Sequence, residues 1–220
     1  MIVVFDLDGT LIDSAHDVAT SANELVTTLG GQPLALDDVV MMIGEGAAVL
    51  VKRALAAAGL DPDTPNALAH FLEIYNRHLL DRTMPYPGVK ETLAIAQQRA
   101  RLAVLTNKPL APTERILEGL GLREFFDLVV GGDNARGRKP DPAALLALAS
   151  ERPAEGALFV GDSPIDYSTA RAGNIPFGWA RYGFGSDRFG VDVPVTPYVL
   201  DAPRDLVAVL DRLRSVESHA

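Results

Sequence analysis

The 220-residue sequence contains no cysteine. This absence excludes disulfide bonds and any metal site or nucleophile that depends on a thiolate. The chain also lacks an apolar run long enough to cross a membrane or to serve as a signal peptide, and its N-terminus carries no basic leader. From these absences we expect a cytoplasmic protein with no membrane partner.

The chain also has fewer basic than acidic residues. The chain has 20 Lys and Arg residues against 29 Asp and Glu residues, which gives a formal net charge of −9. An acidic chain without a basic stripe is repelled by the phosphates of nucleic acids and by anionic membrane surfaces, so we expect neither as a partner. An anionic substrate would need cations supplied locally, by lysine, by arginine or by a metal ion.

Short apolar runs alternate with helical patterns over most of the chain, which is long enough to bury one sizeable core or one core and a smaller domain. The predicted strands are 2–5, 102–105, 128–130, 157–160, 177–180 and 198–200, and the predicted helices among them include 88–99, 111–120 and 206–213. Such alternation is typical of an α/β protein with a parallel sheet covered by helices on both faces.

Four consecutive helical patterns interrupt this alternation after the first strand. They lie at 14–29, 36–43, 47–58 and 68–80, with no predicted strand between them. A block of helices between strands of one sheet indicates an inserted domain. We therefore predict a core of residues 1–13 and 85–220 and a helical domain of residues 14–84, rejoined to the core by a stiff segment that contains Pro85 and Pro87.

Polar side chains recur at the carboxyl ends of several predicted strands. These are Asp6 and Asp8 after the first strand, Thr106 after the second, and Asp162 with Asp166 after a later one, while Lys139 lies in a loop before a helix. The carboxyl ends of parallel strands share one edge of the sheet, where ligands bind in open α/β folds. We therefore expect these side chains to converge.

A cluster of carboxylates is unfavourable unless a cation neutralises it. Mg²⁺ takes oxygen ligands and keeps some of its waters, so two carboxylates, a backbone carbonyl and a phosphate oxygen make a suitable shell. Lys139 adds a positive charge, and hydroxyl or amide donors for phosphate oxygens come from Gly9, Thr10, Thr106 and Asn107. The pattern predicts a Mg²⁺-dependent site for a phosphorylated substrate.

Four segments carry a resemblance to a known family. They are Asp6-Leu7-Asp8-Gly9-Thr10-Leu11, Thr106, Lys139-Pro140 and Gly161-Asp162-Ser163-Pro164-Ile165-Asp166. In this order, and at strand ends, they resemble the four motifs of the haloacid dehalogenase-like hydrolase superfamily. The resemblance spans essentially the whole chain and implies a flavodoxin-like (Rossmann-like) core with a helical cap domain inserted after the first motif.

The chemistry of the residues and the resemblance agree on their roles. Asp6 is expected to attack phosphorus and form an aspartyl-phosphate, and Asp8 to act as general acid and then general base while its backbone carbonyl binds the metal. Asp162 is expected to bind the metal directly, and Asp166 to hold metal-bound water or the motif lysine. Ser163 either supports this shell or caps the helix that follows.

The second aspartate of the first motif separates branches of the superfamily. Dehalogenase members lack it, since the displacement of halide needs no acid for the leaving group, so the presence of Asp8 favours phosphoryl transfer. The intact set of motif residues also argues against a binding relative without catalytic activity, because such a relative usually loses the nucleophile.

Shorter stretches are similar to the bacterial phosphoglycolate phosphatase-like subgroup. They include Ile43-Gly44-Glu45-Gly46-Ala47, Tyr86-Pro87-Gly88-Val89 and Gly131-Gly132-Asp133. This likeness implies a phosphatase for a small phosphorylated metabolite, 2-phosphoglycolate in the first place, that works as a monomer or small homo-oligomer. A β-phosphoglucomutase-like phosphotransferase is the alternative, because it would use the same aspartates but protect its intermediate from water.

The helical domain offers few candidates for substrate recognition. Gly46 is one, because the amides of its turn could meet a small carboxylate at the start of a helix, although an ordinary turn is an equally good interpretation. Arg53 is expected to be a solvated surface charge, and Tyr75 to contribute to packing.

Overall fold

A parallel sheet forms the centre of the molecule in the computed structural model, which describes residues 1–150, 156–190 and 193–217. Within these residues the sheet has six strands in the order β5-β4-β1-β6-β7-β8. They are β1 (Ile2–Phe5), β4 (Arg101–Leu105), β5 (Leu128–Val130), β6 (Ala157–Gly161), β7 (Phe177–Ala180) and β8 (Tyr198–Leu200). All neighbouring pairs are parallel, so the predicted sheet is confirmed.

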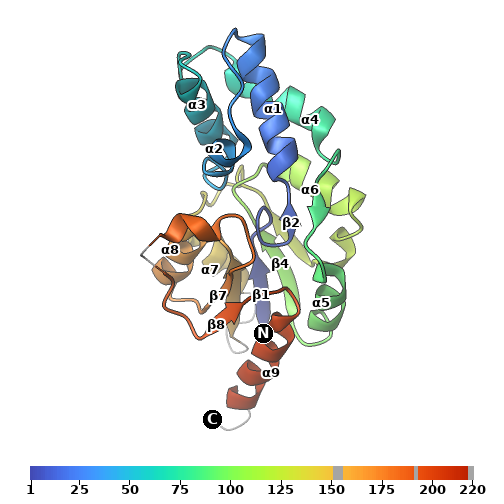
Figure 1. Cartoon of the computed structure of the whole chain (residues 1–220). Coiled ribbons are helices and arrows are strands. Elements are labelled where there is room, and N and C mark those ends of the chain that lie inside the picture. The colour runs from blue at the N-terminus through green and yellow to red at the C-terminus, as the bar shows by residue number, and fades with distance from the viewer. Residues whose placement is uncertain (151–155, 191–192, 218–220) are drawn as a thin grey trace.

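Helices cover both faces of this sheet (Figure 1). They are α5 (Val89–Ala96), α6 (Leu110–Gly119), α7 (Ala143–Ala149), α8 (Pro164–Ala172) and α9 (Asp205–Glu217). Val3 and Phe5 of β1 belong to the core on one face, with α5, α6 and α9, whereas Ile2 and Val4 belong to the core on the other face, with α7 and α8. Because successive side chains enter opposite cores, all of β1 is buried and its sequence is an unbroken apolar run.

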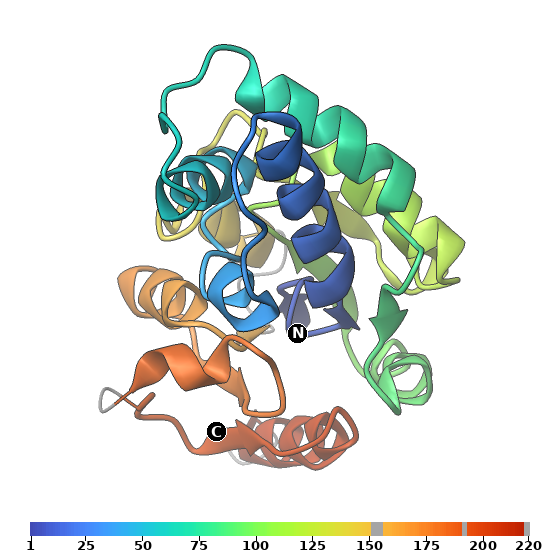
Figure 2. The same cartoon turned by 45° about the horizontal axis from the view of Figure 1, so that its top comes forward.

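Four helices form a separate layer beyond the carboxyl-end edge of the sheet (Figures 1 and 2). They are α1 (Ala15–Thr28), α2 (Leu36–Val40), α3 (Ala47–Ala57) and α4 (Ala67–His78). In this cap layer α1 packs against α4 and α2, and α3 packs against α1 and α4. Among the described residues, no helix is both long enough and apolar enough to cross a membrane.

The boundaries of the cap helices follow the predicted ones closely, with one difference. The pattern at 36–43 predicts a helix of eight residues, but α2 ends at Val40. Residues 41–44 turn instead, and Gly44 adopts a φ of +114°, outside the helical region. The chain then enters α3 through Gly46, and this turn brings the loop down onto the core.

A short antiparallel ribbon joins the cap to the core. β2 (Ile12–Asp13) pairs with β3 (Met84–Pro85), so the segments that leave the core and return to it lie side by side. The sequence pattern predicts a stiff linker at the return point and gives no sign of pairing, since strands of two residues have no measurable periodicity.

Asp17 connects the first helix of the cap to the segment that follows its last helix. Its buried carboxylate accepts hydrogen bonds from the backbone N–H of Arg82 at 3.0 Å, and from the N–H and hydroxyl of Thr83 at 2.8 and 2.7 Å. These donors directly precede β3, so α1 and the return strand are held together beside the ribbon.

Candidate active site

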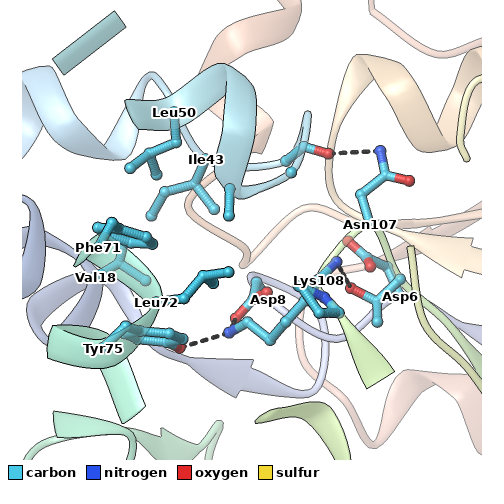
Figure 3. A pocket seen from close by; sticks show the side chains of 15 residues that line it. Asp6, Asp8, Val18, Ile43, Leu50, Phe71, Leu72, Tyr75, Asn107 and Lys108 are labelled. Atoms are coloured by element: carbon cyan, nitrogen blue, oxygen red, sulfur yellow. Dashed lines mark hydrogen bonds and ion pairs between the residues drawn. The ribbon is translucent and has the colours of Figure 1, made fainter. Parts of the chain in front are cut away.

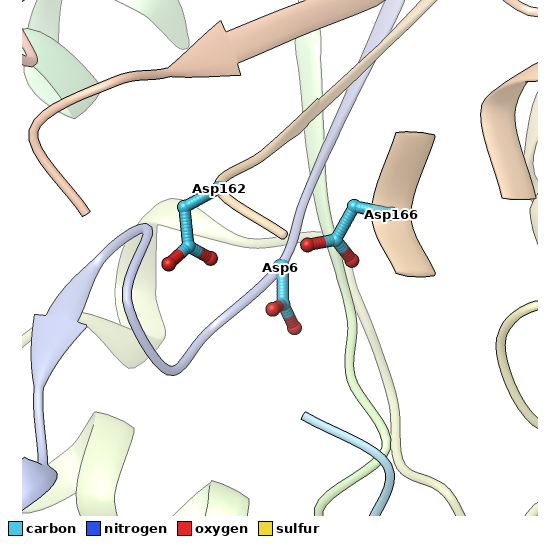
Figure 4. Close-up of side chains that lie close together, drawn as sticks. All are labelled: Asp6, Asp162 and Asp166. Atoms are coloured by element: carbon cyan, nitrogen blue, oxygen red, sulfur yellow. The ribbon is translucent and has the colours of Figure 1, made fainter. Parts of the chain in front are cut away.

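Three buried carboxylates meet at the carboxyl-end edge of the sheet (Figure 4). Asp6 follows β1, Asp162 follows β6, and Asp166 lies in the first turn of α8. One oxygen of each lies within 4.8 Å of the others, and the three residues are 5%, 1% and 0% exposed. The structure thus brings together acids that are up to 160 residues apart in the sequence, as expected for strand ends of one sheet.

Lys139 provides a cation inside this cluster. Its Nζ lies 2.7 Å from Oδ1 of Asp6 and 2.6 Å from Oδ1 of Asp166. Burial by itself would lower the pKa of Lys139, but the two carboxylates outweigh burial and raise it, so the ammonium stays charged.

One ammonium does not neutralise three carboxylates. Burial, followed by the charge of Asp166, raises the pKa of Asp6 to about 7 against the opposing effect of Lys139. Burial and the charges of Asp166 and Asp6 also raise the pKa of Asp162 well above its usual range. The cluster therefore holds more negative charge than its own residues compensate, which favours the binding of a further cation.

The donor set fits Mg²⁺, because it consists of oxygens at a buried site with excess negative charge. Asp6 and Asp162 are placed to hold the ion through their carboxylates. Asp166 accepts through Oδ1 from the Lys139 ammonium and through Oδ2 from Ser163, whereas the described donors to Asp162, Thr10 and Gly185, are neutral. Asp166 is therefore better placed than Asp162 to orient the lysine. Metal binding by the backbone carbonyl of Asp8 stays a prediction.

Ser163 acts as a helix cap. Its hydroxyl donates to Oδ2 of Asp166 at 2.6 Å and accepts a bond from the Asp166 N–H at 3.4 Å, while the Ser163 N–H donates to the same carboxylate at 3.1 Å. This capping box begins α8, and Pro164 occupies the first helical turn. The structure thereby supports the capping interpretation of Ser163 and shows how the cap fixes Asp166.

The turn after β1 is shaped by Asp162. Gly9 has a φ of +89°, and a Cβ at this position would lie 2.0 Å from Oδ2 of Asp162. The Thr10 hydroxyl donates to Oδ1 of Asp162 at 3.2 Å, and the Gly185 N–H donates to Oδ2 at 2.7 Å. The Thr10 side chain, a predicted phosphate donor, is thus directed to the metal-site carboxylate in this structure.

Asp8 is not part of this group of three acids and lies beside side chains of the cap (Figure 3). Its Oδ1 accepts hydrogen bonds from Nζ of Lys108 at 2.6 Å and from the hydroxyl of Ser14 at 2.5 Å. Nζ of Lys108 also donates to the hydroxyl of Tyr75 on α4 at 2.7 Å. A chain of contacts therefore runs from the predicted general acid, through a core lysine, to a cap tyrosine.

Lys108 and Tyr75 are functional candidates that the sequence pattern does not single out. The available signal for Lys108 is its place in the polar run Thr106-Asn107-Lys108 at the end of β4. Tyr75 does pack as expected, with its ring stacked on Phe71 at 5.8 Å between centroids, but its hydroxyl serves Lys108.

Asn107 connects the core to the cap loop. Its side-chain N–H groups donate to the carbonyls of Gly44 and Lys139, both at 2.9 Å. Its Oδ1 is buried and has no hydrogen-bond partner among the described residues. Thr106 is buried beside it and its hydroxyl accepts a bond from the Lys108 N–H at 3.2 Å. The predicted phosphate contacts of these two residues stay predictions.

A small cavity of about 50 Å³ lies between the core and the cap. Its lining from the core comprises Asp6, Asp8, Thr106, Asn107, Lys108 and Pro109, and its lining from the cap comprises Val18, Ile43, Gly44, Gly46, Ala47, Leu50, Phe71, Leu72 and Tyr75. Such a volume holds about three to five water molecules, which indicates a small ligand.

Two predictions for the cap have different outcomes. Gly46 borders the cavity at the start of α3, with a φ of +88°. Arg53 is absent from the described lining; its guanidinium pairs with Glu45 at 2.6 Å, and its side chain is 43% exposed. Arg53 is therefore the surface charge that the sequence predicts, whereas Gly46 keeps its place as a candidate substrate contact.

Known proteins are similar to this chain in sequence, and solved structures are similar to it in fold. A phosphoglycolate phosphatase from Rhodospirillum rubrum is 43% identical over 84% of this chain and 81% of its own length. Phosphoglycolate phosphatase 1 from Pseudomonas aeruginosa is 37% identical over 98% of this chain and 81% of its own length. A crystal structure described as a predicted phosphoglycolate phosphatase from Haemophilus somnus has a TM-score of 0.83, with 29% identity over 94% of this chain and 96% of that one.

A family model described as haloacid dehalogenase-like hydrolase matches residues 3–180. The match includes β1 with Asp6 and Asp8, the cap, Lys139 and the Asp162 loop, which are the parts that build the acid cluster and the cavity. Motif order, fold and site geometry all agree with this match. The chain belongs to the haloacid dehalogenase-like hydrolases.

Proposed function

We propose that this chain is a Mg²⁺-dependent phosphatase that hydrolyses 2-phosphoglycolate through an aspartyl-phosphate on Asp6. The observation that carries the proposal is the position of Asp6, which belongs to the acid cluster and also lines the cavity together with Asp8. The substrate assignment is supported by the relatives named phosphoglycolate phosphatase and by a cavity suited to a small molecule.

The first half of the reaction uses both motif aspartates. An oxygen of Asp6 attacks phosphorus, the phosphorus–oxygen bond of the ester breaks, and Asp8 gives a proton to the departing oxygen. Lys139 beside Asp6 offsets negative charge on the phosphoryl oxygens. Mg²⁺ held by Asp6 and Asp162 would supply further charge neutralisation there.

The second half regenerates the enzyme. Asp8 takes a proton from a water molecule, the water oxygen attacks phosphorus, and the bond from phosphorus to Asp6 breaks to release inorganic phosphate. In the described structure the hydrogen bonds to Asp8 both go to Oδ1, from Lys108 and Ser14, which leaves Oδ2 to exchange this proton.

The experiment is a panel of phosphorylated metabolites assayed for phosphate release with and without Mg²⁺. We expect the highest kcat/KM for 2-phosphoglycolate, and a loss of at least about 10³-fold in kcat for Asp6→Asn because the nucleophile is removed. Asp63→Asn on the cap surface is the matched control, since this carboxylate pairs with exposed Lys52. It should leave the rate unchanged.

Product analysis separates the phosphatase from the mutase alternative. Accumulation of an isomerised sugar phosphate in place of free phosphate would support a β-phosphoglucomutase-like phosphotransferase. Retention of every measurable activity by Asp6→Asn would instead favour a binding protein, because Asp6 would then have no catalytic task.

A further inference from the structure

The site contains two buried lysines on opposite sides of Asp6 and Asp8. Lys139 pairs with Asp6 and Asp166 on the side of the acid cluster. Lys108 pairs with Asp8 on the side of the cap, where its side chain is 8% exposed. In the proposed reaction Lys139 offsets charge on the phosphoryl oxygens, whereas Lys108 has no role beyond its contact with Asp8.

Burial of a charged lysine lowers the stability of the folded protein unless the ammonium has polar or charged partners. The Nζ of Lys108 lies 2.6 Å from the carboxylate of Asp8 and 2.7 Å from the hydroxyl of Tyr75, and both contacts stabilise a charged ammonium. Among the described residues that line the cavity, Lys108 is the one positively charged side chain. The cap contributes mainly apolar groups around it, such as Val18, Leu50 and Phe71. A second anionic group of a substrate therefore has one favourable place in this cavity.

We propose that Lys108 binds the carboxylate of the substrate and thereby selects phosphate esters of short hydroxy acids, an inference that rests on the proposed phosphatase function. The ammonium has three N–H donors. The described contacts account for two of them, to Oδ1 of Asp8 and to the hydroxyl of Tyr75 (Figure 3). The third is available for a carboxylate that enters the cavity beside Leu72 and Tyr75.

The distance between Asp8 and Lys108 suits a short substrate. Nζ lies 2.6 Å from Asp8, and the ester oxygen that Asp8 protonates lies one further hydrogen bond away, at about 2.7 Å. Because Nζ bonds Oδ1 and the proton is exchanged at Oδ2, the width of the carboxylate adds to these two distances, and the ester oxygen and Nζ lie within roughly 7 Å of each other. A carboxylate on the carbon that bears the ester oxygen, or on the next carbon, can span this gap.

Tyr75 fixes the position of Lys108 from the cap. Its hydroxyl is 2.7 Å from Nζ, and its ring is held by the stack on Phe71. Because Tyr75 belongs to α4 and Lys108 to the core, the carboxylate site is complete only when the cap lies on the core as it does here. Tyr75 is thus a positioning residue for the lysine.

The experiment compares 2-phosphoglycolate with ethyl phosphate, in which a methyl group replaces the carboxylate. For Lys108→Met we expect the ratio of the two kcat/KM values to fall about 10²-fold, the effect of losing one charge-assisted contact. Any effect of Lys108 on Asp8 is common to both esters and cancels in this ratio. Lys52→Met removes an exposed cap lysine and should leave the ratio unchanged.

Tyr75→Phe provides a second variant that keeps the charge of Lys108 and the aromatic stack. We expect its KM for 2-phosphoglycolate to rise about fivefold, with little change in kcat, because only one hydrogen bond that orients the lysine is lost. Its KM for ethyl phosphate should stay the same. This variant tests the inference even if Lys108→Met does not fold.

The inference is overturned if either variant affects both esters equally, because Lys108 would then serve Asp8 or the fold alone. It is also overturned if the wild-type protein hydrolyses ethyl phosphate as well as 2-phosphoglycolate, although the phosphatase function would stand. Release of phosphate from neither ester, nor from any other in the panel, would overturn the proposed function itself.

Discussion

The titration of Asp6 links metal binding to pH. In the metal-free protein, burial and Asp166 raise the pKa of Asp6 from 3.8 to about 7. Between these values the folded protein binds a proton that the unfolded chain has released, so the free energy of unfolding of the metal-free protein falls as pH rises toward 7. Mg²⁺ binds the ionised carboxylate and competes with this proton, so its affinity rises over the same range.

We therefore expect Mg²⁺ to raise the Tm of the protein more at pH 8 than at pH 6. Thermal unfolding with and without Mg²⁺ at the two pH values measures this difference directly. Asp63→Asn serves as control, since its exposed carboxylate lies on the cap surface and should not alter the pattern. An equal Tm increase at both pH values would show that no proton is displaced from the cluster.

Two glycines with almost the same φ allow the effect of backbone strain to be separated from the effect on the metal site. Gly9 has a φ of +89° and lies against the Asp162 carboxylate, while Gly88 has a φ of +88° and no atom within 4 Å of an added Cβ. Gly88→Ala should lower the free energy of unfolding by about 1–2 kcal/mol, through backbone strain alone. Gly9→Ala should in addition displace Asp162 and abolish the Tm increase caused by Mg²⁺.

A Mg²⁺ titration followed by thermal unfolding distinguishes these two variants. If Gly9→Ala responded to Mg²⁺ as strongly as Gly88→Ala does, Asp162 would not be a ligand or the turn would not support it.

Individual residues differ in how far the sequence predicts them. Asp6, Lys139 and Asp162 converge because each follows a strand of one parallel sheet or precedes a helix at its edge, which a pattern of strands can indicate. The Lys108 contacts depend on side chains 100 residues away at Asp8 and 33 residues away at Tyr75, one of them from the cap. No local pattern contains such a pairing, so Lys108 is recognised only in the folded structure.

At the scale of elements, Asp17 is the residue that holds the entry and exit of the cap together. Replacing it with Ala removes three hydrogen bonds to a carboxylate and leaves the donors of Arg82 and Thr83 without their acceptor. We expect the free energy of unfolding to fall by about 2–4 kcal/mol. Urea unfolding measures this loss, and Asp63→Ala at the cap surface should cost under about 0.5 kcal/mol. A similarly small loss for Asp17→Ala would mean that the ribbon alone secures the cap.

The elements themselves are predicted well where an apolar run is bounded by turn residues. The strands Leu128–Val130, Phe177–Ala180 and Tyr198–Leu200 have the predicted bounds, because apolar runs between turn residues mark them. The ribbon of β2 and β3 is missed, because two residues in each strand carry no alternation and Pro85 is more typical of a linker. The shortened α2 reflects the turn at Gly44, which depends on contacts with the core such as Asn107.

In the whole molecule the sheet edge and the cap layer contribute different parts of the site. The sheet edge provides the acid cluster and Lys139, which we propose to act on the phosphoryl group of the substrate. The cap covers that edge and completes a small cavity in which Lys108 meets Tyr75. The chain passes from core to cap and back again at one place, where the ribbon of β2 and β3 and the contacts of Asp17 hold the two segments together. Elsewhere the cap contacts the core through the hydrogen bond from Asn107 to Gly44.

In the proposed reaction Asp6 forms a covalent bond to phosphorus. The most direct test of this step is to quench a reaction of the protein with 2-phosphoglycolate and Mg²⁺ in acid during the first turnover and to locate phosphate by peptide mass spectrometry. We predict a phosphate adduct on the peptide that carries Asp6, and none in Asp6→Asn. An adduct on a different residue, or continued turnover by Asp6→Asn, would show that Asp6 is not the nucleophile.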